Sequence, residues 1–165
     1  MSQTSENYAK AVDVIMAGEK QIVLPVKRLS SRAILPTKAY PLDAGYDLYA
    51  PVPTQFKPGQ ITKVDTEIAV AIPDGYVGLL WDRSSMGAKG IKVLGGVIDS
   101  GYRGPLIINL VLTNTNERDW IDFPAGHKIA QLVVQRVAHF PVQEFINNLP
   151  ESVRGERGFG SSDVK

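Results

Sequence analysis

The period of the apolar positions changes once along the chain, close to residue 20. Before that point, four apolar residues have the i, i+4, i+7, i+8 spacing of one helix face, Ser5 can cap a helix, and Gly18 can end it. We therefore predict a helix over residues 5–17. Such a helix is more typical of an accessory element, packed on the body or on a partner, than of a catalytic one. Its apolar residues are Tyr8, Val12, Ile15 and Met16.

After residue 20, short β-rich runs alternate with turn residues. Proline sets φ, glycine permits positive φ, and Asn or Asp bonds its own backbone, so the intervening motifs predict tight turns. Many short strands at this spacing predict an all-β barrel or jelly roll. The β-rich runs are residues 21–29, 60–72, 76–81, 105–113, 120–123 and 129–138, and the turns fall at 41–45, 57–59, 73–75, 114–116 and 124–126.

A chain of 165 residues is typical of one domain. We expect a helical extension over residues 1–20, a β-barrel domain over 21–150, and a flexible C-terminal tail over 151–165. The N-terminal 20 residues lack the basic start and apolar run of a secretory signal. The longest apolar-rich stretch, 106–112, is too short to cross a bilayer. A cytoplasmic location without a membrane partner is the expectation.

The amino-acid composition disfavours several kinds of functional site. The sequence has no cysteine, which rules out disulfides, cysteine-ligated zinc and thiol catalysis, and its two histidines disfavour a multi-histidine metal site. The net charge is +1, from 18 basic and 17 acidic residues, which argues against a general nucleic-acid binder. A small anionic ligand, held by a few local arginines, stays compatible with this charge.

Two stretches combine glycine with charged or hydroxyl groups. In DAGYDLYA (43–50), Asp43 and Asp47 flank a glycine, and closely spaced carboxylates can hold a divalent cation directly or through its waters. The alternative is a turn aspartate that bonds its own backbone. In DRSSMGAKG (82–90), arginine offers a fork for phosphate and serine a donor, although the order of residues is not that of a P-loop. The alternative there is a solvated loop.

Two further stretches are GGVIDSGYRG (95–104) and PAGHKIAQLVV (124–134). Asp99 can orient or deprotonate a water, and Tyr102 has a flat face that suits a sugar ring, but an ordinary tight hairpin explains the pattern equally well. Gln131 lies among core-like residues, where a buried amide needs partners. His127 in a turn is more typical of a surface residue than of a catalytic one.

The tail sequence RGERGFGSS (154–162) cannot build a core by itself. Ordering a glycine-rich segment costs about 1–2 kcal/mol per residue, which only a ligand or a neighbouring chain can offset. Its arginines and serines can bind phosphates, and Phe159 can cover a base. The combination is typical of a lid over a nucleotide polyphosphate, with a floppy terminus as the alternative.

In sequence order, DAGYDLYA, RSSMGAKG, GGVIDSGYRG, GHKIAQL and RGERGFGSS resemble the five motifs of the trimeric dUTP diphosphatases (dUTPases), over residues 43–162. The resemblance implies a jelly-roll-like β-fold and a homotrimer with three active sites at subunit junctions, each closed by a neighbour's tail. It implies Mg²⁺-assisted hydrolysis of dUTP to dUMP and pyrophosphate. That reaction limits uracil in DNA and supplies dUMP for dTMP synthesis.

The same resemblance implies roles for individual residues. Asp99 would activate the water that attacks the α-phosphorus, and Asp47 would place Mg²⁺ through water. Tyr102 would stack on deoxyribose and exclude a 2′-hydroxyl, and Phe159 would stack over uracil. The other implied substrate-binding residues are Gly96, Val97 and Ile98 at the uracil edge, and Arg83, Ser84, Ser85, Gln131, Arg154, Gly160, Ser161 and Ser162 around the phosphates.

The sequence departs from the family pattern at several places. Asp82 stands where the family usually has a proline before the motif arginine, and Ser85 stands where it has a glycine. His127 and Lys128 replace the common Asp-Arg pair, and Arg157 replaces a tail glycine.

Two rival functions stay open. A dCTP deaminase of the same superfamily carries a glutamate ten residues after the motif-three aspartate, where this chain has Asn109. A catalytically idle member would bind nucleotide or a protein partner, for which residues 1–20 could serve, but it would not need Asp99.

Overall fold

A computed structural model describes residues 23–113, 120–146 and 148–157 of the chain. The helix predicted over 5–17 lies outside these residues. The described elements are β1 (Val26–Arg28), β2 (Gly45–Ala50), β3 (Thr54–Phe56), β4 (Ile61–Asp65), β5 (Ile68–Val70), β6 (Tyr76–Trp81), α2 (Ser84–Gly87), β7 (Ile91–Leu94), β8 (Val97–Ile98), β9 (Ile107–Leu112), β10 (Ile121–Phe123) and β11 (His127–Arg136).

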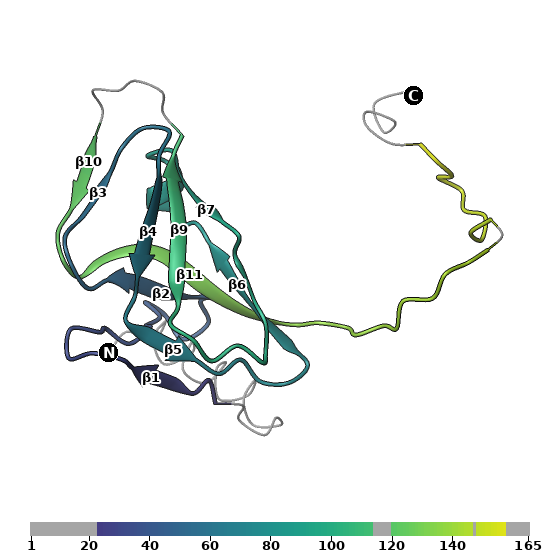
Figure 1. The fold of residues 1–165 in the computed structure, drawn as a ribbon, viewed down its shortest axis with the longest axis horizontal. Coiled ribbons are helices and arrows are strands. Elements are labelled where there is room, and N and C mark those ends of the chain that lie inside the picture. Colours follow the sequence, from purple (N-terminus) through teal and green to yellow (C-terminus); the bar gives the residue numbers. More distant parts are fainter. Residues whose placement is uncertain (1–22, 114–119, 147, 158–165) are drawn as a thin grey trace, which may run out of the picture.

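The strands pair antiparallel in two principal sheets, one in the order β2-β11-β6-β8 and the other in the order β4-β9-β7. Two smaller ribbons, β1-β5 and β3-β10, complete the body (Figure 1). Side chains from both principal sheets form one buried cluster, which includes Leu48, Ile108, Leu110 and Leu132. The prediction of an all-β, jelly-roll-like fold is therefore confirmed.

One of the two inner strands of the larger sheet, β11, carries a β-bulge. Its pairing register with β2 shifts between Lys128 and Ala130, and the consecutive residues Ile129 and Ala130 are both buried. Strict alternation would turn one of those two residues outward. Because the bulge accommodates one extra residue, Lys128 and Gln131 both stay partly exposed beside β2. Bulges next to functional sites commonly reorient side chains in this way.

Most β-rich runs contain a strand in the structure, and β6 coincides with the predicted run 76–81. The run 60–72 is interrupted at Glu67, which has a φ of 55° and whose N–H donates to the Asp65 carboxylate. It therefore forms two strands, β4 and β5, which belong to different sheets. The predicted runs did not include β2, β3, β7, β8 or the short helix α2.

The segment after β11 leaves the body. In Figure 1, residues 137–146 and 148–157 run away from the barrel as a long extended arm. Large apolar side chains on this arm are exposed, and Phe140 has 83% of its surface accessible. Val142 and Ile146 are almost fully exposed as well. Within the described residues, these side chains pack on no part of the buried core.

The described part of the chain contains no helix of the length and apolar character needed to cross a membrane.

The packing of α2 yields a stability prediction. Met86 is the buried residue of α2 and is 0% exposed, so it anchors this short helix to the core. We expect Met86→Ala to lower the free energy of unfolding by about 2–5 kcal/mol, since it leaves a cavity. Met86→Leu, which conserves volume, should cost less than about 1.5 kcal/mol. Urea unfolding at one fixed protein concentration measures both, and equal costs for the two variants would contradict the anchoring role.

Candidate functional site

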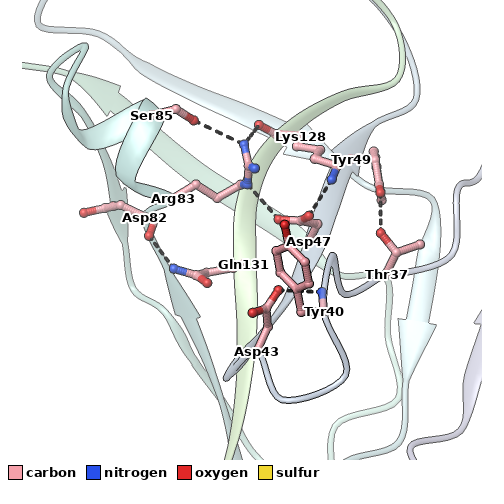
Figure 2. A network of polar contacts seen from close by, with 10 residues as sticks. All are labelled: Thr37, Tyr40, Asp43, Asp47, Tyr49, Asp82, Arg83, Ser85, Lys128 and Gln131. Atoms are coloured by element: carbon pink, nitrogen blue, oxygen red, sulfur yellow. Dashed lines mark hydrogen bonds and ion pairs between the residues drawn. The ribbon is translucent and has the colours of Figure 1, made fainter. Parts of the chain in front are cut away.

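Asp47 lies in the middle of β2 and pairs with two cations from other segments. Its Oδ1 accepts from Arg83 Nε at 2.7 Å, and its Oδ2 lies 2.7 Å from Lys128 Nζ. Arg83 follows β6, whereas Lys128 belongs to β11, so one carboxylate joins three segments that are distant in the sequence (Figure 2). The Asp47 side chain is only 13% exposed, which makes this pairing necessary for a charged carboxylate.

The network sets the protonation of its members. Burial raises the pKa of Asp47, but hydrogen bonds from Lys128 and Arg83 and their positive charges outweigh it, and the net pKa lies below its ordinary value. The hydrogen bond to Asp47 raises the pKa of Lys128. Burial, together with the charges of Arg83 and Lys89, lowers the pKa of His127. Asp47 is therefore an anion held between two cations.

The Arg83 guanidinium is oriented by more than Asp47. Its Nη1 donates to Ser85 Oγ at 3.2 Å and more weakly to the Lys128 carbonyl at 3.4 Å. Ser84 and Ser85 are exposed residues of α2, directly after Arg83. Arginine, two hydroxyls and the start of a helical turn thus lie together on one exposed edge, where they can bind an anion.

Gln131, on β11, lies between β2 and β6, and its side chain reaches the residue after β6. Its Nε2 donates to the Asp82 carbonyl at 2.8 Å, which is the partner that a partly buried amide requires (Figure 2). A Cβ on Gly45 would lie 2.1 Å from Gln131 Oε1, so this path needs glycine on the neighbouring strand. The sequence predicted that Gln131 needs partners but did not predict which groups they are.

Asp82 also makes contacts through its side chain. Its Oδ1 accepts from the Val93 N–H at 2.6 Å, and its Oδ2 forms an ion pair with Lys92, both from β7. The Asp82 carboxylate is thus bonded to β7, whereas the Arg83 guanidinium bonds to Asp47, Ser85 and Lys128.

Asp43 and Tyr49 complete the surroundings of the network. The Asp43 carboxylate accepts from the Tyr40 N–H at 2.9 Å, so Asp43 is the turn aspartate that the sequence offered as an alternative to a cation ligand. The Tyr49 hydroxyl lies 2.5 Å from Thr37 Oγ1.

A second group of predicted residues lines a cavity of about 210 Å³ beside β8. Val97, Ile98, Asp99 and Tyr102 form one side of it. Asp99 is exposed, and its carbonyl accepts the Tyr102 N–H at 3.1 Å in the turn after β8. The Tyr102 hydroxyl donates to the Pro105 carbonyl at 2.9 Å, which fixes the ring against the cavity.

The structure thus brings the predicted residues together in two groups. Asp47, Arg83, Ser85 and Gln131 belong to one network, and among the described residues none of the four lines the cavity of Asp99. Of the tail positions, Arg154 lies on the exposed arm, where its Nε donates to the Arg157 carbonyl at 3.0 Å. Phe159, Gly160, Ser161 and Ser162 lie outside the described residues.

Sequence reasoning missed Lys128 and Asp82 as members of the site. Both were noted only as departures from a family pattern. The sequence has an excess of charged residues around Arg83 and His127, and this excess could have pointed to them. Which of these residues form ion pairs depends on the bulge in β11 and on the pairing of distant strands.

Comparisons with known proteins agree on one family. The family model described as dUTPase matches residues 31–163. The deoxyuridine 5′-triphosphate nucleotidohydrolase of Rhodococcus erythropolis is 42% identical over 142 residues, which are 84% of this chain and 85% of that protein.

Solved structures give the same result. The dUTPase of Staphylococcus bacteriophage 80alpha with dUpNHpp has a TM-score of 0.81 and 31% identity, over 87% of this chain and all of that one. A mutant dUTPase from phage phi11 of S. aureus, described with a structural Mg(II) ion, has a TM-score of 0.70 and 27% identity, over 76% of this chain and 98% of that one.

The low pKa of Asp47 predicts a pH dependence of stability. A carboxylate with a lowered folded-state pKa stabilises the fold fully above its ordinary value of 3.8, and this contribution is lost as the pH falls through the folded-state pKa. We expect Asp47→Asn to lower the free energy of unfolding near neutral pH, and the difference from the parent to shrink below pH 3.8. Urea unfolding across that range measures it. A difference that is constant or grows in acid would contradict the assignment.

Proposed function

The chain belongs to the dUTPase family, and from this premise we propose how its two groups of residues act in one reaction. The protein is a dUTP diphosphatase, which hydrolyses dUTP to dUMP and pyrophosphate. The observation that carries the proposed roles is that Asp99, Tyr102 and the β8 hairpin share one cavity. We also propose that the reaction limits uracil in DNA and supplies dUMP for dTMP synthesis.

The cavity beside β8 would hold the deoxyuridine. Val97 and Ile98 pair with Leu79 and Gly78 of β6, so the backbone that would read the uracil edge belongs to a sheet and is rigid. The carbonyl of Gly96 accepts the Leu80 N–H at 2.7 Å, which fixes the start of the hairpin. A rigid hairpin excludes bulk that a flexible loop would accommodate, so a 5-methyl group on the base should be rejected.

Tyr102 would select the sugar. Its hydroxyl is bonded to the Pro105 carbonyl, so the ring cannot swing away from the cavity without losing that bond. A flat ring packed against deoxyribose leaves no space for a 2′-hydroxyl. Discrimination against UTP would therefore come from the fixed position of the ring.

Asp99 would act as the general base. Its carboxylate is exposed at the cavity, where it can accept a proton from a water that attacks the α-phosphorus. The water oxygen forms a bond to the α-phosphorus, the bond from that phosphorus to the bridging oxygen breaks, and pyrophosphate leaves. Phosphoryl transfer needs positioning and charge neutralisation more than covalent chemistry.

The Arg83 network would hold the phosphate chain. The guanidinium has five N–H donors in a fixed fork, so it can bind phosphate oxygens while Asp47 orients it. Ser84 and Ser85 add hydroxyl donors on the same exposed edge. Gln131 has a second N–H besides the one bonded to Asp82, and that donor can reach an oxygen.

We propose Mg²⁺ as a cofactor that arrives with the nucleotide. Among the residues that the structure describes, no group of three or more His, Asp or Glu side chains could hold an ion alone. Mg²⁺ keeps several waters and is commonly bound by few carboxylates together with substrate phosphates, and the ionised Asp47 fits that limited role by accepting from a metal-bound water. When bound, Mg²⁺ neutralises charge on the phosphate chain.

We propose a homotrimer whose sites combine residues from different copies. Two features of the described residues support it: the Asp99 cavity contains no member of the Arg83 network, and the arm after β11 exposes large apolar side chains. The tail, with Arg154, Phe159, Gly160, Ser161 and Ser162, would close over the nucleotide on a neighbouring copy. We place the protein in the cytoplasm with small nucleotides, and not nucleic acid or membranes, as its partners.

The rival deaminase function is disfavoured by position 109. That position carries Asn109, in the middle strand of the β4-β9-β7 sheet, and its buried Oδ1 has no hydrogen-bond partner in the described residues. An amide cannot take up a proton as a glutamate does. Pyrophosphate release measured side by side with dUTP, dTTP, UTP and dCTP, with and without Mg²⁺, separates hydrolysis from deamination and from binding without turnover.

The role of Asp99 predicts the behaviour of one variant. Asp99→Asn should lower kcat by roughly 10²–10⁴-fold, the usual contribution of a general base, with nearly unchanged affinity for dUpNHpp. Asp74→Asn, which removes an exposed carboxylate from the turn before β6, is the matched control and should keep parental turnover. If Asp99→Asn hydrolyses dUTP at close to the parental rate, Asp99 is not the base.

The role of the tail predicts the effect of a truncation. Deletion of residues 154–165 should cripple catalysis and leave the oligomer intact, because Arg154 and the other described tail residues are exposed and contribute nothing to the core. Turnover and sedimentation of the truncated protein test this together. Dissociation of the oligomer, or full activity without the tail, would count against the lid.

A further inference from the structure

We propose that Asp82 is a positioning residue for dUTP hydrolysis, which fixes the backbone in front of Arg83 so that the guanidinium meets the phosphate chain. The inference rests on the proposed phosphate-binding role of Arg83. It concerns a position where the sequence departs from the family pattern, with an acid in place of the usual proline.

Asp82, the residue after β6, makes hydrogen bonds and an ion pair to two other strands. Its carboxylate accepts the Val93 N–H at 2.6 Å and pairs with Lys92, which bonds it to β7. Its carbonyl accepts from Gln131 Nε2 at 2.8 Å, which bonds it to β11. The Asp82 side chain is therefore bonded to one principal sheet, and the Asp82 carbonyl is bonded to the other.

Arg83 lies between two such fixed points. Asp82 precedes it, and on the other side Met86 anchors α2 in the core at 0% exposure. Arg83 itself has extended backbone, with a φ of −78° and a ψ of 148°, and makes no side-chain capping bond to α2. The direction of its side chain is therefore set by its neighbours and by Asp47.

The Asp82 carboxylate does not compete with Asp47 for the Arg83 guanidinium. The Asp82 side chain is 15% exposed and bonded to Lys92 and Val93, and in Figure 2 it points away from the Arg83 guanidinium. Lys92 neutralises the carboxylate locally, so a negative charge next to a phosphate site does not repel the nucleotide strongly. A proline would restrict φ through its ring, whereas Asp82 restricts the same backbone through bonds to β7 and β11.

The test separates positioning from folding by comparing two ligands. dUpNHpp carries the full phosphate chain that Arg83 would bind, whereas dUMP lacks the β- and γ-phosphates. Asp82→Ala should weaken dUpNHpp binding about tenfold or more, because a displaced guanidinium loses charge-assisted hydrogen bonds to the β- and γ-phosphates, and should change dUMP affinity less than about twofold. Asp82→Asn keeps an oxygen acceptor for the Val93 N–H and should restore dUpNHpp affinity to within about threefold of the parent, the scale of one weakened hydrogen bond.

Arg83→Ala serves as the control for the underlying proposal. If it weakens dUpNHpp binding and Asp82→Ala does not, Asp82 is not a positioning residue and the role of Arg83 stands. If Arg83→Ala leaves dUpNHpp binding unchanged, the proposed role of Arg83 fails first. Equal losses for dUpNHpp and dUMP in Asp82→Ala, with a lower unfolding midpoint, would show a merely structural role and overturn the inference. If Asp82→Ala does not fold, Asp82→Ser, whose hydroxyl is too short to reach both Val93 and Lys92, carries the same prediction.

Discussion

The ion pairs of Asp47 with Arg83 and Lys128 are the interaction on which the proposed phosphate-binding edge depends. A carboxylate in the middle of a strand, only 13% exposed, is unfavourable unless cations compensate it. The two cations come from the end of β6 and from β11, so the three segments must meet for the charge to be satisfied. The same requirement aims the Arg83 guanidinium, because its Nε has one favourable acceptor there. The ion pairs that satisfy the buried charge of Asp47 therefore also orient the guanidinium that we propose for phosphate binding.

Local sequence patterns predicted the parts of the fold that depend on short-range physics. The strand β6 and the turn at Pro-Asp-Gly (73–75), where Gly75 has a φ of 79°, follow from alternation and turn chemistry. The break at Glu67 was not predictable, because a non-glycine residue with positive φ is uncommon. Short strands such as β8 need a partner strand to be recognised.

The sequence offered candidate site residues but not the contacts between them. Asp47, Arg83, Asp99 and Tyr102 could be selected from residue type and motif order. The pairing of Lys128 with Asp47 could not, since it depends on a bulge that keeps Lys128 and Gln131 partly exposed beside β2. The bonds of Asp82 to β7 likewise depend on strand placement, which one sequence does not reveal. Long-range contacts are thus the part that residue patterns alone leave undetermined.

The body and the arm differ in how their apolar side chains are buried. The barrel has a core of its own, whereas the arm exposes Phe140 and Val142. If each site joins Asp99 of one copy to Arg83 of another, two inactive proteins should complement each other. Co-expression of Asp99→Asn with Arg83→Ala chains and assay of the mixed oligomers tests this directly. Recovery of dUTP hydrolysis well above that of either variant alone is the expected result, and a mixture as inactive as its components would show that both groups act within one chain.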